Sequence, residues 1–99
     1  MSLDPVVVAS KQYSVVVDNA KVRVLKVSYG PHEQAASHLH PDSVLVTLTE
    51  MNTTFTYPDG KSEDVRVPAG TAVFMAGTTH ATLNKTGNRF DGYLIELKH

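Results

Sequence analysis

The 99-residue sequence contains no cysteine. This absence excludes disulfide bonds and thiolate metal sites, so any bound metal must be held by imidazole, carboxylate, amide oxygen or water. An excess of charge is missing too: nine basic and ten acidic residues give a formal net charge of −1, with the charges scattered along the chain. Since nucleic acids and anionic membranes attract proteins with clustered positive charge, we expect neither as a partner.

Long apolar runs are also absent. No segment approaches the roughly 18 consecutive apolar residues of a membrane-spanning helix. The first residues, MSLDPVVVAS, have no basic lead, and their apolar run is shorter than the roughly 7–15 residues of a signal-peptide core. We therefore expect a cytoplasmic protein.

Helical periodicity is weak throughout the chain. Apolar residues recur at every second position, and valine and threonine dominate the regular segments, as is typical of β-strands. The predicted strands are 5–9, 13–18, 22–29, 43–50, 53–58, 63–68, 71–76, 80–84 and 90–98. The pattern predicts an all-β fold, a barrel or sandwich of eight or nine antiparallel strands with little or no helix.

Two of these segments carry local detail. Asp59-Gly60 supplies residues that tolerate positive φ, which predicts a hairpin between the strands on either side. In 22–29, Leu25 and Lys26 interrupt the alternation of the valines, which either a β-bulge or burial of both strand faces would explain.

The length fits one domain over 1–99, because no linker, repeat or low-complexity tract divides the chain. A chain of this size buries only about 60–65% of the surface that its unfolded form exposes. Such a small core, together with sheet edges that need covering, predicts a homodimer. Residues 1–10 are expected to form an N-terminal strand or arm, which the two subunits could exchange.

Three histidines are the candidates for metal binding. His38 and His40 stand two residues apart, so on a strand both imidazoles would point to the same face, about 6.5–7 Å apart. His80 follows a glycine-containing turn forty residues later. Imidazole suits divalent iron, zinc, nickel, copper or manganese, but histidines at a strand entrance are also common as ordinary surface groups. His32, in a loop, and His99, at the C-terminal end, are weaker candidates.

The segments around these histidines resemble the two motifs of the cupin superfamily, small β-barrels of jelly-roll type. The turn YGPHEQAAS precedes the pair His38 and His40, and the strand SVLVTLTE follows it. The second segment, PAGTAVFMAGTTHATLN, contains Gly70, then His80 and Asn84. The resemblance extends from Val22 to Leu97 and implies a cupin domain that holds a divalent metal ion, Fe²⁺, Zn²⁺, Ni²⁺ or Mn²⁺, through the three histidines.

The chain departs from the family pattern at two places. The usual glutamate ligand would fall at Val44 or Leu45, and Met75 replaces the proline of the second-motif turn. Asp42 is a possible substitute ligand, although Pro41 beside it favours a role in a turn. The loop residues His32, Glu33 and Gln34 are possible outer partners of the site, although solvated positions suit them as well.

Alternation along the strands predicts which side chains line the cavity beside the histidines. These residues are Val44, Val46, Leu48, Thr82 and Asn84, counted by twos from His40 and His80, with Phe55, Tyr57, Phe74 and Met75. Thr54 and Thr56 are the alternative to Phe55 and Tyr57. The cavity would be mostly apolar, and the chain has no glycine-rich phosphate loop, so we expect a small organic ligand or substrate.

The three-histidine pattern resembles that of cupins which include iron-dependent dioxygenases acting on thiols or diketones. This resemblance implies a metal-dependent enzyme, dioxygenase-like in the first place, with isomerase or lyase activity as a second form. A non-catalytic module that binds a small ligand or a metal, or a metal-free barrel, is the alternative. Tyr57, Tyr93 and Glu96 are candidate acid or base groups, and the sequence does not select among them.

Overall fold

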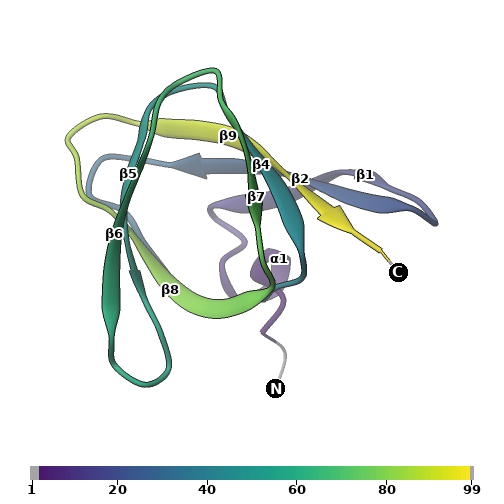
Figure 1. Cartoon of the computed structure of the whole chain (residues 1–99), viewed down its shortest axis with the longest axis horizontal. Coiled ribbons are helices and arrows are strands. Elements are labelled where there is room, and N and C mark those ends of the chain that lie inside the picture. Colours follow the sequence, from purple (N-terminus) through teal and green to yellow (C-terminus); the bar gives the residue numbers. More distant parts are fainter. Residues whose placement is uncertain (1–2, 99) are drawn as a thin grey trace.

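The computed structural model describes residues 3–98, which form two antiparallel β-sheets and one short helix (Figure 1). One sheet has the strand order β1-β2-β9-β4-β7 and the other β3-β8-β5-β6. The first comprises β1 (Tyr13–Asp18), β2 (Val22–Tyr29), β9 (Phe90–Leu97), β4 (Ser43–Thr47) and β7 (Ala72–Met75). The second comprises β3 (Gln34–His40), β8 (Thr78–Asn84), β5 (Met51–Thr56) and β6 (Ser62–Val67). The predicted all-β fold is thus confirmed.

The core lies between the sheets because one face of each central strand is apolar. In β9, and in β2 from Leu25 onward, every second residue is buried, and Leu25 pairs with Leu94 and Tyr29 with Phe90 across the ladder. The opposing sheet contributes Met51 and Phe55 to the same cluster. Burying one large apolar side chain stabilises the fold by about 1.5–3 kcal/mol, and this burial is the main force that holds the two sheets together.

The irregular pattern of β2 reflects burial on both faces. Leu25, Val27 and Tyr29 are buried, while the side chains between them are half-buried, and the pairing of β2 with β9 runs without a break. The bulge lies instead in the neighbouring strand, β1, between Val15 and Val17.

The predicted hairpin between β5 and β6 is present. The Gly60 N–H donates to the Tyr57 carbonyl oxygen at 2.9 Å, and Gly60 has a φ of 87°. A glycine in this left-handed conformation after a tight turn is the usual way to rejoin two antiparallel strands.

The prediction of a strand at 5–9 is wrong. Pro5–Val8 forms the short helix α1, which Figure 1 shows beside the sheets near the N-terminal end of the described chain. Asp4 caps this helix by accepting from the Val6 N–H at 3.1 Å, and Pro5 occupies its first turn. A capping aspartate followed by proline favours helix initiation, and here it outweighs the strand preference of the valines.

The strand that carries the histidine pair was not among the predicted segments. β3 spans Gln34–His40, so His38 and His40 stand at its end, and the chain then turns at Pro41 and Asp42 into a strand of the other sheet.

None of the described helices is long and apolar enough to cross a membrane.

Candidate metal centre

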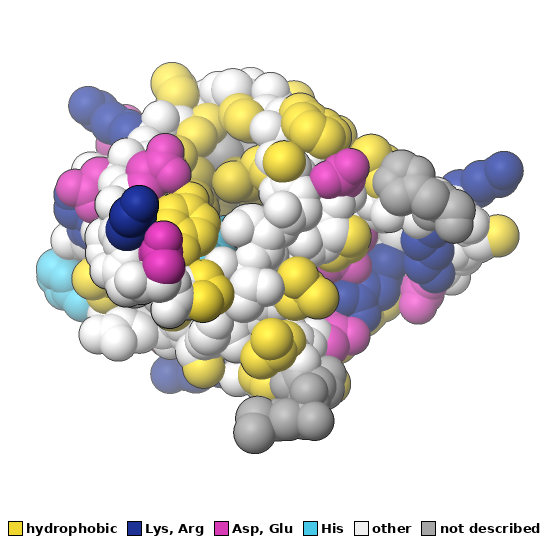
Figure 2. Space-filling model, turned by 60° about the horizontal axis from the view of Figure 1, so that its bottom comes forward, with side chains coloured by type: hydrophobic (Ala, Val, Ile, Leu, Met, Phe, Trp, Pro, Cys, Tyr) yellow, Lys and Arg dark blue, Asp and Glu magenta, His cyan; other side chains and the backbone are white. Residues whose placement is uncertain are grey.

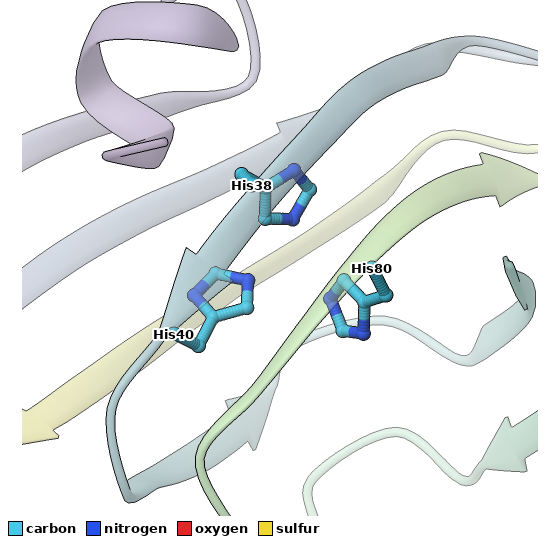
Figure 3. Close-up of side chains that lie close together, drawn as sticks. All are labelled: His38, His40 and His80. Atoms are coloured by element: carbon cyan, nitrogen blue, oxygen red, sulfur yellow. The ribbon is translucent and has the colours of Figure 1, made fainter. Parts of the chain in front are cut away.

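Strand pairing brings the three histidines onto one patch of a single sheet. His38 and His40 alternate along β3, and His80 on β8 lies directly opposite His38 in the ladder. The ring centroids are 4.6 Å apart for His38 and His40, 5.0 Å for His38 and His80, and 5.1 Å for His40 and His80. One nitrogen from each ring lies within 4.8 Å of the other two, and Figure 3 shows the rings grouped around a shared space.

A β-bulge in β3 makes this grouping possible. The register with β8 shifts between Ala35 and His38, and the burial pattern changes there, because Ala36 and Ser37 are both exposed. The extra residue turns His38 and His40 to the inner face, the side that Ala35 already occupies. The Ala36 carbonyl oxygen at the bulge also accepts from His38 Nδ1 at 2.6 Å. This contact places the proton on Nδ1 and leaves the Nε2 lone pair available to a metal.

The other two rings are held by different contacts. His80 stacks on Phe55, with the ring centroids 4.2 Å apart and the planes 2° from parallel. His40 Nδ1 faces the carboxylate of Glu96, with 4.0 Å between Nδ1 and Oε2. Within the described residues, His40 Nδ1 and His80 Nδ1 have no hydrogen-bond partner.

Burial keeps the imidazoles of His38 and His80 neutral. His38, His40 and His80 are 0%, 8% and 3% exposed. Burial lowers the pKa of His38 to about 4, although the bond to Ala36 opposes the shift. Burial and the neighbouring histidines lower the pKa of His80 to about 3. Because a metal binds the unprotonated ring nitrogen, the donor set fits a divalent transition metal at neutral pH.

A partly open cavity adjoins the histidines between the two sheets. Its volume is about 40 Å³, room for about three water molecules. His40 and His80 form part of its wall, and the rest is mostly apolar or aromatic: Tyr13, Val27, Tyr29, Ser43, Leu45, Met51, Thr53, Phe55, Met75, Ala76, Thr78, Thr82, Phe90 and Leu94. Figure 2 shows the surface hollowed, with hydrophobic side chains gathered around the hollow.

Several predicted lining residues lie at this cavity. Phe55, Met75 and Thr82 line it, whereas Tyr57, which was predicted together with Phe55, does not. Asn84 is buried on the same face of β8, but its side chain donates to the carbonyl oxygens of Gly30 and Asn88 and shapes a turn.

The prediction for β4 is wrong by one residue. Val44 and Val46 point away from the cavity, Leu48 is 50% exposed, and Ser43 and Leu45 line the cavity instead. Counting by twos from His40 fails because the turn at 41–42 carries the chain into the other sheet, where alternation starts afresh. Phe74 was also misplaced: it is 61% exposed, on the outer face of the edge strand β7.

The candidate outer groups have other roles. Asp42 accepts from the Gly77 N–H at 2.7 Å, which ties two turns together. Glu33 accepts from Gln12 at 2.8 Å and pairs with Lys11. His32 and Gln34 are exposed, and His99 lies outside the described residues.

The three candidate acid or base groups lie in different environments. Tyr93 is on the outer face of β9, where Lys26 lies over its ring at 4.9 Å, and it does not line the cavity. Tyr57 donates to Glu63 at 2.8 Å, and this bond raises its pKa. Glu96 is 3% exposed and lies against His40.

Sequence reasoning missed two tyrosines that line the cavity. Tyr13 and Tyr29 share a hydrogen bond of 2.8 Å between their hydroxyl oxygens, and Tyr13 Oη lies 3.4 Å from His38 Nε2. Burial raises the pKa of Tyr13 to about 12, so it is a neutral hydrogen-bonding group. The alternation Leu25, Val27, Tyr29 could have indicated that Tyr29 points inward. Tyr13 depends on strand register, which the sequence alone does not give.

Solved structures share this architecture. A cupin domain from Bordetella pertussis has 26% sequence identity and a TM-score of 0.80, over 88% of this chain and 92% of that one. The fold is that of a cupin. A protein with a double-stranded β-helix domain from Klebsiella pneumoniae has 19% identity and a TM-score of 0.67, over 86% of this chain and 74% of that chain. An RmlC-like cupin family protein from Methanocaldococcus jannaschii has 17% identity and the same TM-score, over 90% and 83% of the two chains.

Comparison of sequences adds nothing further to the cupin assignment. No family model matches the chain, and no curated protein matches it. The cupin fold and the cluster of three histidines together fit metal binding.

Proposed function

We propose that the chain holds one divalent metal ion through His38, His40 and His80 and acts on a small organic molecule in the adjoining cavity. The observation that carries this proposal is the convergence of ring nitrogens from three buried histidines, two of which, His40 and His80, lie at the wall of an apolar cavity. Three protein ligands leave coordination positions open, which is typical of catalytic rather than structural metal sites.

The ligand set bears on the choice of metal. Three imidazoles are neutral, so the ion keeps its full charge, and hard cations such as Mg²⁺ and Ca²⁺ lack the carboxylates that they prefer. We propose Fe²⁺, Zn²⁺, Ni²⁺ or Mn²⁺. When bound, such an ion supplies Lewis-acid or redox chemistry.

The chain's own residues suggest how a substrate would be held. Phe55, Leu45 and Leu94 give the cavity an apolar wall, and polar contacts in such an environment are stronger than in solution. The hydroxyls of Tyr13 and Tyr29 lie inside it and could donate to a substrate oxygen beside the histidines. A cavity volume of about 40 Å³ favours a small substrate. From the resemblance to three-histidine cupins we propose dioxygenase-like chemistry on a small diketone or thiol, with isomerase or lyase activity for a metal without redox chemistry.

The metal content of the purified protein tests the proposal. Protein prepared without a histidine tag is expected to contain one transition-metal ion per chain, and His40→Ala and His80→Ala are expected to lose it, because two imidazoles retain an ion poorly. His32→Ala, which removes an exposed histidine outside the cluster, serves as the matched control and keeps the metal. Equal metal content in all four proteins would contradict the three-histidine site.

Oxygen uptake separates an enzyme from a binding module. We expect the iron-loaded protein to consume dioxygen with a member of a panel of small diketones and thiols, and the His80→Ala protein to consume none. A metal-loaded protein that consumes no dioxygen with any of them favours the alternative, a non-catalytic cupin that binds a metal or small ligand.

A further inference from the structure

A buried carboxylate lies behind His40, on the side away from the other two rings. Glu96 Oε2 is 4.0 Å from His40 Nδ1, so the nitrogen that His40 turns toward His38 and His80 in Figure 3 is Nε2. Glu96 is 3% exposed and His40 8% exposed. Among the residues from 3 to 98, neither Oε2 of Glu96 nor Nδ1 of His40 has a hydrogen-bond partner. Two unsatisfied buried atoms that face each other are costly unless they pair.

Strand pairing fixes where this carboxylate lies. In the ladder, Glu96 on β9 stands between Arg23 on β2 and Ser43 on β4. Because only the turn at 41–42 separates Ser43 from His40, the inner face of β9 at Glu96 comes close to the end of β3. No sequence motif links Glu96 to His40, and their proximity follows from the fold alone.

Arg23 and Asp4 hold the carboxylate from its other side. Arg23 Nε donates to Glu96 Oε1 at 2.5 Å, and its two terminal nitrogens donate to the Asp4 carboxylate at 2.9 and 3.0 Å. Burial alone would raise the pKa of Glu96, but His40 and Arg23 on either side keep it below its usual value.

We propose that Glu96 is the positioning residue of His40. Its carboxylate accepts a hydrogen bond from Nδ1–H of His40 once a small rotation of either side chain closes the 4.0 Å gap. That bond selects the tautomer whose Nε2 is free to bind the metal. The inference rests on the proposed metal site.

A merely structural role is the competing explanation, in which Glu96 serves only to pair with Arg23. The two explanations differ in what they require of His40. A positioning role requires that Nδ1 carries the proton even without metal, whereas an ion pair with Arg23 alone sets no tautomer.

The tautomer of His40 tests the inference without any metal. Two-bond ¹H–¹⁵N correlation spectra of the metal-free wild-type protein, recorded at mildly alkaline pH, show which ring nitrogen carries the proton. We expect the Nδ1–H form at His40. An Nε2–H form would overturn the inference whether or not the protein binds a metal.

Zinc affinity, measured by competition with a chromophoric chelator, provides the second test. Glu96→Ala is expected to weaken zinc binding by about 10- to 100-fold, the usual effect of losing an outer partner of a metal ligand. Glu96→Gln is expected to retain part of the affinity and the Nδ1–H tautomer, because its amide oxygen still accepts. Glu50→Ala is the matched control, since Glu50 is an exposed carboxylate paired with Arg66.

Thermal unfolding shows whether each variant is folded. If Glu96→Ala does not fold, Glu96→Gln and the wild-type tautomer decide the matter. Folded Glu96 variants that bind zinc as tightly as the wild type would overturn the inference. Failure of the wild type to bind zinc would instead contradict the proposed function, while the tautomer of His40 still tests the contact with Glu96.

Discussion

Each of the three histidines is held by a different kind of contact at the residue scale. A backbone carbonyl orients His38, an aromatic ring stacks on His80, and a carboxylate faces His40. The first contact depends on a bulge, the second on packing and the third on ionic groups. The three ring orientations should therefore respond separately to substitution.

The buried histidines also make the stability of the metal-free protein depend on pH. The pKa values of His38 and His80 in the folded chain, about 4 and about 3, lie below the usual value of 6.5. At a pH between the folded and the unfolded pKa values of these histidines, the unfolded chain binds more protons than the folded chain. The free energy of unfolding should therefore fall as the pH decreases from about 6.5 toward about 3.

Urea unfolding at a series of pH values measures this dependence. His80→Gln, which does not titrate in this range, should show a smaller loss of stability on acidification than the wild type. Identical pH profiles for the two metal-free proteins would contradict the assignment of His80 as a buried neutral imidazole.

At the scale of the strands, the backbones pack too closely at Gly92 of β9 to admit a side chain. A Cβ added there would meet the Val46 carbonyl oxygen at 2.7 Å and the Phe90 ring at 3.1 Å. The backbones of β9 and β4 leave no room for it, and forcing extra atoms into a packed site costs about 1–3 kcal/mol. Gly92→Ala should lower the free energy of unfolding by about that amount.

Gly87→Ala is the matched control for this prediction. The nearest atom to its added Cβ is 3.9 Å away, in the exposed loop before β9. Denaturant unfolding should find this variant close to the wild type. Equal stability of the two variants would contradict the described packing of β9 against β4.

The elements also show how far the sequence could predict the site. The alternation of His38 and His40 on one strand, and the resemblance around His80, identified all three histidines of the cluster. The bulge at 36–37 and the change of sheet at 41–42 have no clear sequence signal, because many residues suit an irregular backbone. These irregularities account for the errors at Val44 and Val46.

The partners of the site were harder to predict than the histidines. Arg23 and Glu96 lie 73 positions apart in sequence, and only the register of β2 with β9 brings them together. The same is true of Tyr13, which reaches the cavity through its pairing with Val27. Residue type alone places charged groups such as Arg23 and Glu96 on the surface, and burial becomes acceptable only once they pair.

At the scale of the whole molecule, the homodimer remains a proposal that the surface supports. β1 is an edge strand whose outer part is exposed, with Val15, Val16 and Val17 at 45%, 51% and 44% exposure. Apolar edge strands tend to be covered in stable proteins. We propose that a second copy of the chain covers this one.

Sedimentation at micromolar concentration should give a dimer for the wild type. Val16→Lys should shift it toward monomer, because a charge on the covered edge is costly to bury. Leu48→Lys, at an exposed leucine in the loop after β4, should leave the dimer intact. A monomeric wild-type protein would contradict the proposal.

The most direct test of the central claim is a crystal structure of the metal-loaded protein with anomalous diffraction measured at the absorption edge of the added metal. The account predicts one anomalous peak per chain, at coordination distance from a ring nitrogen of each of His38, His40 and His80. A peak at other residues, or no peak between the three rings in crystals grown with excess metal, would contradict it.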